Sequence, residues 1–255
     1  SSAGGLTVLQ ATNLTRGAGG VVHFTGVGAD LSDTSNSRVQ ITGGTNPFVN
    51  NVLPWATISG PAGFDLVTDG DGSSATAPYF IERFTGYNTS VNFGGVVRLT
   101  GGTDTLIGNA VVDALLIENG ATINGAFTLQ IGGGAAANQV GQMGSRGAAN
   151  TIAAVTTVTF DGGANTREAL IIADSNLTIG GTLDASNGNA LRKEGLGDLV
   201  LNGDNDTGVA TGQLASPITV NAGRLLVSHE DGLGTEPGGA VTINRRAALI
   251  LNATA

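Results

Sequence analysis

The residues best suited to chemistry lie in one segment of the chain. Asp69 and Asp71 alternate with glycine, and Glu82 and Arg83 follow further along. Clustered carboxylates beside a basic group are what polysaccharide lyases and hydrolases use for metal or acid/base work at a sugar. The sequence Asp-Gly-Asp-Gly is also ordinary turn chemistry, in which the carboxylates face solvent. We therefore expect a solvated loop here and no catalytic residue.

Two aspartate pairs could bind calcium, because hard cations take several oxygen ligands from short loops. The pairs are Asp69 with Asp71 and Asp204 with Asp206. Neither pair belongs to a full calcium-binding loop, and residues 26–30 match only one fragment of a calcium-binding nonapeptide repeat. His23 and His229 have no His or Cys near them in sequence, so we expect packed or rim histidines. We expect no cofactor, with calcium as the weaker alternative.

Aromatic residues make up only 4% of the chain and are concentrated before residue 95. They could form a glycan-binding platform or a protein contact, because aromatic rings offer a large apolar surface. The alternative, which we favour, is that they pack a looped segment onto the rest of the fold. The interaction candidates are Trp55, Tyr79, Phe80, Phe84 and Tyr87.

The charge balance and the lengths of the apolar runs argue against nucleic acid and the membrane interior as partners. There are 11 Lys and Arg against 20 Asp and Glu, for a net charge of −9, and no stretch gathers the basic residues into a stripe. A nucleic-acid backbone would be repelled by this charge. No apolar run is long enough to cross a bilayer as a helix, so we expect no membrane insertion by this segment. The absence of cysteine agrees with export, because many exported bacterial proteins avoid thiols.

Short runs of alternating apolar and polar residues recur from Val96 onward, each closed by a Gly or Asn turn. An alternating run buries every second side chain, which predicts β-strands. The runs that begin at residues 218 and 241 share the form apolar-Thr-apolar-Asn and start 23 residues apart. That spacing is typical of a solenoid in which each turn packs on the next. Glycine and β-branched residues interrupt the longer windows, so we expect little or no helix, with residues 191–194 as one short candidate.

The fold class expected from these patterns is all-β, a parallel β-helix with a lateral, loop-rich insertion. We expect residues 1–95 to hold N-terminal β-helical rungs interrupted by that insertion at about residues 46–88, and residues 96–255 to hold regular repeats. Proline is the reason for the insertion, because it would break central strands. The four prolines of this segment are Pro47, Pro54, Pro61 and Pro78.

Residues 191–203 carry the pattern Leu-x-Lys-x-Gly-x-Gly-x-Leu-x-Leu-x-Gly, and residues 218–225 read Ile-Thr-Val-Asn-Ala-Gly-Arg-Leu. With Thr211-Gly212 between them and further matches in residues 231–243, this stretch resembles the autotransporter-associated β-strand repeat family. The resemblance implies a right-handed parallel β-helix, exported to the cell exterior as part of a larger bacterial surface protein, and implies no catalytic residue. The sequence lacks a membrane-barrel pattern at its carboxy end, so we do not expect a complete self-secreting autotransporter.

The function expected is therefore a structural one. We expect a non-catalytic, extracellular β-helical stalk or fibre element at the bacterial surface. Its partners would be further repeats of the same chain or identical subunits stacked end-on, because an uncovered strand row recruits another. The alternatives are a polysaccharide-degrading β-helix and an adhesin that binds glycans or a host surface through its aromatic segment.

Overall fold

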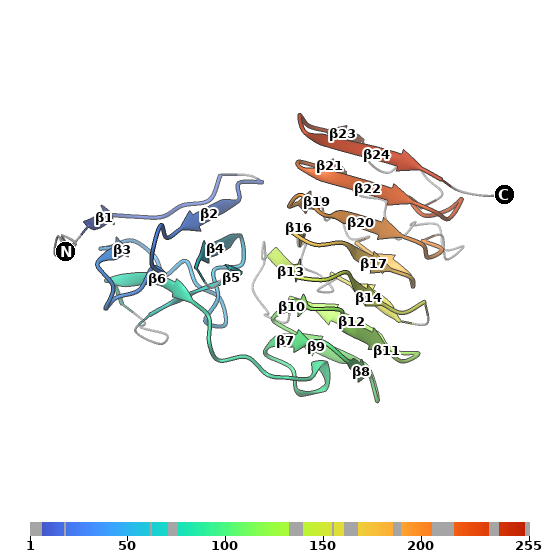
Figure 1. The fold of residues 1–255 in the computed structure, drawn as a ribbon, viewed down its shortest axis with the longest axis horizontal. Coiled ribbons are helices and arrows are strands. Elements are labelled where there is room, and N and C mark those ends of the chain that lie inside the picture. The colour runs from blue at the N-terminus through green and yellow to red at the C-terminus, as the bar shows by residue number, and fades with distance from the viewer. Residues whose placement is uncertain are drawn as a thin grey trace. The chain divides into compact units, whose positions relative to one another are not determined.

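The computed structural model describes residues 7–17, 19–61, 63–70, 76–132, 140–154, 156–160, 168–185, 190–205, 217–234 and 240–252 (Figure 1). In this part of the chain the fold is all-β. Every regular element is a strand, except for one turn of 3-10 helix, η1 (Val91–Phe93). The chain divides into two compact units, Ser1–Gly86 and Tyr87–Ala255.

The N-terminal unit is built on one six-stranded sheet in the order β1-β3-β6-β5-β4-β2. β1 with β3 and β2 with β4 are parallel, whereas β5 and β6 run antiparallel to their neighbours. The unit has its own apolar core, which includes Ile41, Leu53, Ile58 and Ile81. Its strands are β1 (Thr7–Ala11), β2 (Val22–Thr25), β3 (Ser37–Ile41), β4 (Ala56–Gly60), β5 (Gly63–Asp69) and β6 (Tyr79–Arg83).

This unit differs from the expected rungs and loop-rich insertion. Residues 46–88 contain β4, β5 and β6, which lie in the interior of the sheet. The prolines permit this arrangement because they lie outside the strands, with Pro54 just before β4 and Pro78 just before β6. The described strands form a mixed sheet in place of β-helical rungs, and the unit ends at Gly86 rather than at residue 95.

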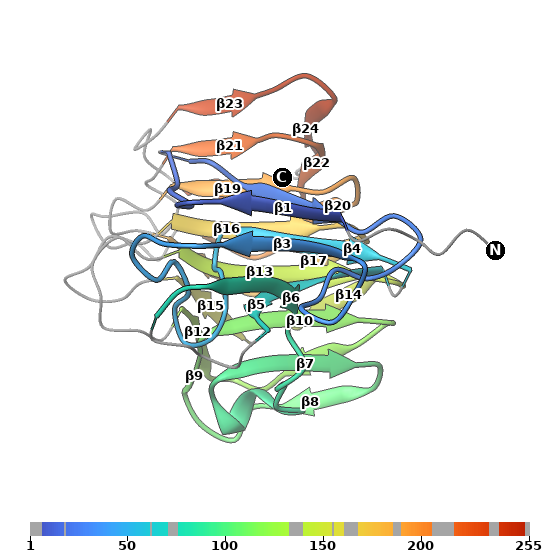
Figure 2. The ribbon, with the colours of Figure 1, turned by 90° about the vertical axis from the view of Figure 1, so that its left-hand side faces the viewer.

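The C-terminal unit is a parallel β-solenoid, which confirms the predicted fold class. Each turn of the chain adds one strand to a first long sheet and then one to a second, and all pairings between these strands are parallel (Figure 2). Among the described residues, each of the first four turns also adds a strand to a third sheet. In this geometry each strand finds its backbone partners in the turns before and after it.

Each of the three sheets takes up its strands in chain order. The first long sheet holds β7 (Val96–Thr100), β10 (Ala114–Glu118), β13 (Val140–Arg146), β16 (Glu168–Ala173), β19 (Leu191–Glu194), β21 (Ile218–Val220) and β23 (Val241–Ile243). The second holds β8 (Thr103–Thr105), β11 (Thr122–Asn124), β14 (Asn150–Ile152), β17 (Leu177–Ile179), β20 (Asp198–Leu201), β22 (Gly223–Val227) and β24 (Ala247–Leu251). The third holds β9 (Ala110–Val112), β12 (Thr128–Ile131), β15 (Thr157–Thr159) and β18 (Leu183–Asp184).

The strand register confirms the 23-residue repeat. Ile218 pairs with Val241, and Val220 pairs with Ile243, on adjacent turns. Residues 191–194 are a strand and not a short helix, because β19 pairs with β16 on one side and with β21 on the other. The tight corner after β19 requires glycine: Gly195 has a φ of +80°, and a Cβ there would lie 2.3 Å from the main-chain oxygen of Ala173.

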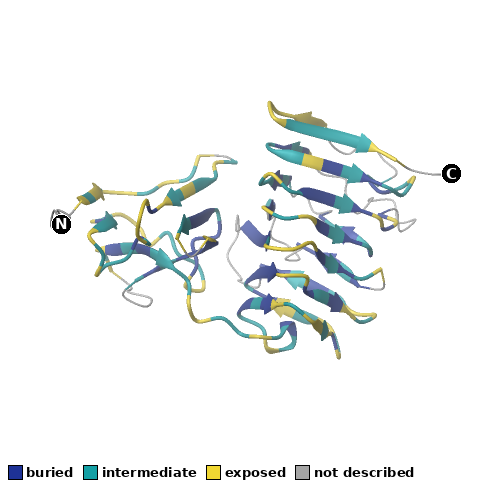
Figure 3. Ribbon diagram, viewed as in Figure 1, coloured by how far each residue is buried: buried dark blue, intermediate teal, exposed yellow. Residues whose placement is uncertain are grey.

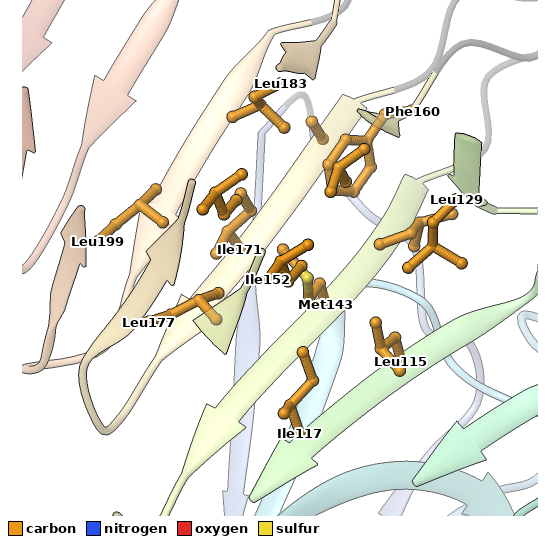
Figure 4. Packing of buried hydrophobic residues seen from close by; sticks show 14 of the residues in the cluster. Leu115, Ile117, Leu129, Met143, Ile152, Phe160, Ile171, Leu177, Leu183 and Leu199 are labelled. Carbon is orange, nitrogen blue, oxygen red and sulfur yellow. The ribbon is translucent and has the colours of Figure 1, made fainter. Parts of the chain in front are cut away.

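The core of the solenoid is a stack of aliphatic side chains enclosed by the sheets (Figure 4). Leu115, Met143 and Ile171 follow one another in register on the first long sheet, and all three are fully buried. Ile152 and Ile179 form a matching buried pair on the second. Burial decreases at the last turn, whose strands are half-exposed or exposed (Figure 3). The stacking of turns therefore supplies the buried surface of this unit.

Candidate functional site

The N-terminal unit contains a cavity of about 330 Å³ beside β5 and β6. Asp69, Glu82 and Arg83 line it, together with Phe84 and Thr68. The structure thus brings together three of the four residues that the sequence singled out for chemistry. The fourth, Asp71, lies outside the described residues.

The polar groups of this cavity make contacts within the protein. An oxygen of Asp69, Oδ1, accepts a hydrogen bond of 2.9 Å from the main-chain N–H of Phe80. Glu82 accepts one from the main-chain N–H of Asp33. Arg83 forms ion pairs with Asp30 at 3.1 Å and with Asp65 at 3.2 Å. These bonds join β5 to β6 and tie the loop of Asp30 and Asp33 to β6, which a structural role explains without any substrate.

The aromatic candidates do not form one platform. Tyr79 is 1% exposed and packs against Phe48, with ring centroids 5.9 Å apart. Trp55 is half-buried against the same core. Phe80 and Phe84 are half-buried in the same unit. Tyr87 belongs to the other unit, where the guanidinium of Arg98 lies 5.6 Å from its ring centroid. Core packing accounts for Tyr79 and Trp55.

Three ionisable side chains are stacked along the first long sheet of the solenoid. Glu118 on β10 is buried between Arg98 on β7, at 2.7 Å, and Arg146 on β13. Burial by itself raises the pKa of the Glu118 carboxyl. Hydrogen bonds from the two arginines and from Thr100 outweigh burial and lower that pKa to about 2. The ion pairs therefore join three successive turns.

Among the described residues of the solenoid interior, Lys193 is the largest charged side chain, and it is fully buried. Its Nζ donates hydrogen bonds to the main-chain oxygens of Gly195 at 2.5 Å, Gly197 at 2.6 Å and Ala222 at 2.8 Å. Burial lowers the pKa of Lys193 to about 8, against an opposing effect of nearby carboxylates, so the group is charged at pH 7. The ammonium group thus joins the corner that follows β19, at Gly195 and Gly197, to the corner of the next turn, at Ala222.

Asn150 plays a comparable part and was missed by the sequence reasoning. Its Oδ1 accepts hydrogen bonds of 3.0 Å from the main-chain N–H groups of Gly120 and Ala121. Its Nδ2 lies within hydrogen-bonding distance of the main-chain oxygens of Ile117 and Ala148. A buried amide at this corner therefore satisfies backbone groups on two turns. An Asn beside Thr in a turn is too common a signal to have revealed it.

One cluster in the described part of the chain has metal-ligand side chains. Ligand atoms of Asp204, His229 and Asp231 lie within 4.8 Å of one another on adjacent turns. Nδ1 of His229, however, accepts a hydrogen bond of 3.1 Å from the main-chain N–H of Asp231. The neutral ring then carries its proton on Nε2, so neither nitrogen offers a lone pair to an ion in this arrangement. Asp206, the predicted calcium partner of Asp204, lies outside the described residues.

His23 is bound within the N-terminal sheet. Its ring nitrogens lie 2.6 Å from Oγ1 of Thr57 and 2.8 Å from Oγ of Ser59 on the neighbouring strand. Both nitrogens are thus used in strand-to-strand contacts. This is a rim histidine, as expected from the sequence.

No family model, curated protein or solved structure matches this chain. The resemblance of residues 191–255 to the autotransporter-associated repeat therefore stays a prediction. Among the described residues, none lies in a helix of the length and apolarity that spanning a membrane requires.

Proposed function

We propose that this chain is a non-catalytic, extracellular segment of a bacterial surface protein, a rigid β-helical stalk or fibre element for surface architecture or adhesion. One observation carries the proposal. The buried polar side chains of the solenoid are engaged between successive turns, as Glu118, Lys193 and Asn150 show. Such contacts stiffen a stack, because each turn is stable only through its neighbours.

The export and the bacterial surface location rest on the repeat pattern of residues 191–225 and on the lack of cysteine. Interaction with further repeats, with identical subunits, or with glycans and host surfaces belongs to the same proposal. The net charge of −9 argues against nucleic acid as a partner.

Single-molecule stretching tests the stalk proposal. The full chain is held by handles at Tyr87 and Asn252, so that force acts on the solenoid alone. We expect no extension at low force, followed by steps of roughly 80 Å as turns unravel, at about 3.5 Å per residue. Smooth extension from low force would contradict a rigid stack.

A carbohydrate-active protein is the second candidate, and the cavity lined by Asp69, Glu82, Arg83 and Phe84 favours it. Carboxylates beside an aromatic ring suit a sugar ligand. The chain is incubated with neutral and acidic polysaccharides, and the release of sugar ends is measured. We expect no release. Release that is lost in an Asp69→Asn, Glu82→Gln double variant, and kept in Glu230→Gln, would establish this alternative in place of the first.

A further inference from the structure

The two ends of the solenoid are built differently, and the first turn is closed. Asn88 forms a parallel bridge along the edge of β7, where its N–H donates to the oxygen of Val96 and its oxygen accepts from the N–H of Arg98, both at 2.9 Å. Asn92 does the same for β8 with its side chain. Its Nδ2 donates to the oxygen of Thr105 at 2.9 Å, and its Oδ1 accepts from the N–H of Ile107 at 3.1 Å.

The apolar side of the first turn is covered as well. Val91, in η1, is fully buried and belongs to the solenoid core. The carboxylate of Asp104 holds this segment in place by accepting hydrogen bonds from the N–H of Val91 at 2.7 Å and the hydroxyl of Ser90 at 3.0 Å. Residues 88–93 thus take the place that a preceding turn would occupy.

The last turn has no such cover in the described part of the chain. Val241 and Ile243 on β23 are 38% and 39% exposed, whereas their register partners Ile218 and Val220 are 2% and 0% exposed. Leu251, at 66%, shows the same change on β24. The paired residues are aliphatic on both turns. Only a covering turn differs between them.

A polar ladder reaches the last turn too. The side-chain amide of Asn221 donates to the carboxylate of Glu194 on the turn before it. Asn244 in turn donates from Nδ2 to Oδ1 of Asn221 at 2.5 Å. In each step a side-chain oxygen of one turn, Oε1 of Glu194 and then Oδ1 of Asn221, accepts from the Asn amide of the next turn, which places Oδ1 of Asn244 as the acceptor for a following turn.

We propose that the last turn is a docking surface for one further β-helical turn of the same repeat chemistry, in parallel register with β23 and β24. This inference rests on the proposed stalk function and fixes the partner more closely. The partner strand is aliphatic-x-aliphatic-Asn, with its aliphatic residues over Val241 and Ile243 and its amide over Asn244. The docking surface continues the interface between β21 and β23, and the closed first turn of a second copy could not supply it.

The experiment adds such a turn to the full chain. A copy of residues 228–251 is placed directly after Leu251, and hydrogen exchange of the original residues 241–251 is followed by mass spectrometry. We expect exchange there to slow at least about tenfold, because the edge amides gain partners. The protection should be lost when the original Ile243 is changed to Asp and kept in Thr242→Asp, whose side chain lies on the outer face of the same strand.

Two results would overturn the proposal. One is unchanged exchange in residues 241–251 of the extended chain. The other is a dimer of the unextended chain, by sedimentation at micromolar concentration, that protects these residues, because an identical subunit would then be the occupant. The stretching experiment on the unextended solenoid does not depend on either result, so the stalk function and the docking surface can fail separately.

Discussion

Gly223 lies directly against the ammonium group of Lys193 on the preceding turn: a Cβ at Gly223 would come within 2.5 Å of Nζ. Gly223 also has a φ of +66°, which L side chains rarely adopt. The lysine of one turn and the glycine of the next are therefore fitted to one another. Both belong to the pattern on which the resemblance to a surface-protein repeat depends, and here that pattern has a physical reason.

Replacing Lys193 with Met should destabilise the solenoid by about 3 kcal/mol, because three partly buried main-chain oxygens lose their donor while the volume of the side chain is kept. Urea unfolding at pH 7 measures the change. Arg245→Met, at an exposed position on the last turn, is the control and should change the free energy of unfolding by less than about 0.5 kcal/mol. If both substitutions lowered the free energy of unfolding equally, the hydrogen bonds of the Lys193 ammonium group would not be what stabilises these corners.

Asn150→Ala should cost about 2 to 3 kcal/mol, because the N–H groups of Gly120 and Ala121 lose their acceptor inside the protein. Those two amides should also exchange with solvent faster than their neighbours, which nuclear magnetic resonance can resolve. Asn124→Ala, at an exposed corner of the same unit, should leave both stability and exchange nearly unchanged. If hydrogen exchange at Gly120 and Ala121 were unchanged in Asn150→Ala, Oδ1 of Asn150 would not be the acceptor of these two N–H groups.

Glu118 makes stability depend on pH in the acid range. Its pKa in the fold, about 2, lies below the ordinary value of 4.5, so the folded state binds the proton less readily than the unfolded state. Its contribution is therefore complete above pH 4.5 and is lost as the pH falls towards 2. Glu118→Gln should lower the free energy of unfolding at pH 7 by about 2 kcal/mol. It should also reduce the amount by which this free energy falls between pH 4.5 and pH 2.

Unfolding in urea at pH 7, 4.5 and 3 measures this dependence. Glu230→Gln is the matched control, since this carboxylate is exposed and should leave the pH dependence unaltered. If Glu118→Gln kept the acid slope of the original chain, the ion pairs with Arg98 and Arg146 would not be what sets it.

Arg246→Gly should stabilise the last turn by about 1 kcal/mol, because Arg246 has a φ of +69°, where only glycine is free of strain. Arg245→Gly should do the opposite, since glycine at an ordinary φ adds freedom to the unfolded chain. Hydrogen exchange of residues 247–251 reports on this turn. Stabilisation by both substitutions would show that backbone strain is not the cause.

The strands of the solenoid could be predicted wherever apolar residues alternate, as in residues 177–183 and 218–227. Strand β13 could not, because its sequence contains two glycines and a glutamine in place of an aliphatic pattern. The fold uses these residues for close packing. A Cβ at Gly141 would come within 2.6 Å of the Phe160 ring. Such a fit depends on a residue that follows β15, on a different sheet, which no local pattern records.

The N-terminal sheet was harder to foresee for a related reason. Its proline-rich composition indicates loops, but the order of its strands depends on antiparallel pairings such as Ile41 with Tyr79, which are distant in sequence. The candidates Asp69, Glu82 and Arg83 were chosen for their chemistry, and the structure does gather them at one cavity. Their partners Asp30, Asp33 and Asp65 could be identified only in three dimensions.

Both proposals depend on the C-terminal unit being a stack of parallel turns. Thr103, Thr178, Val200, Leu226 and Ile250 lie in one register column on the second long sheet. Because the chain has no cysteine, spin labels can be attached to a cysteine at Thr103 paired with one at position 200, 226 or 250. Pulsed electron paramagnetic resonance should give narrow distances that grow by about 4.8 Å per turn, near 19, 24 and 29 Å. Distances that do not rise in equal steps, or that are broad, would contradict the stack.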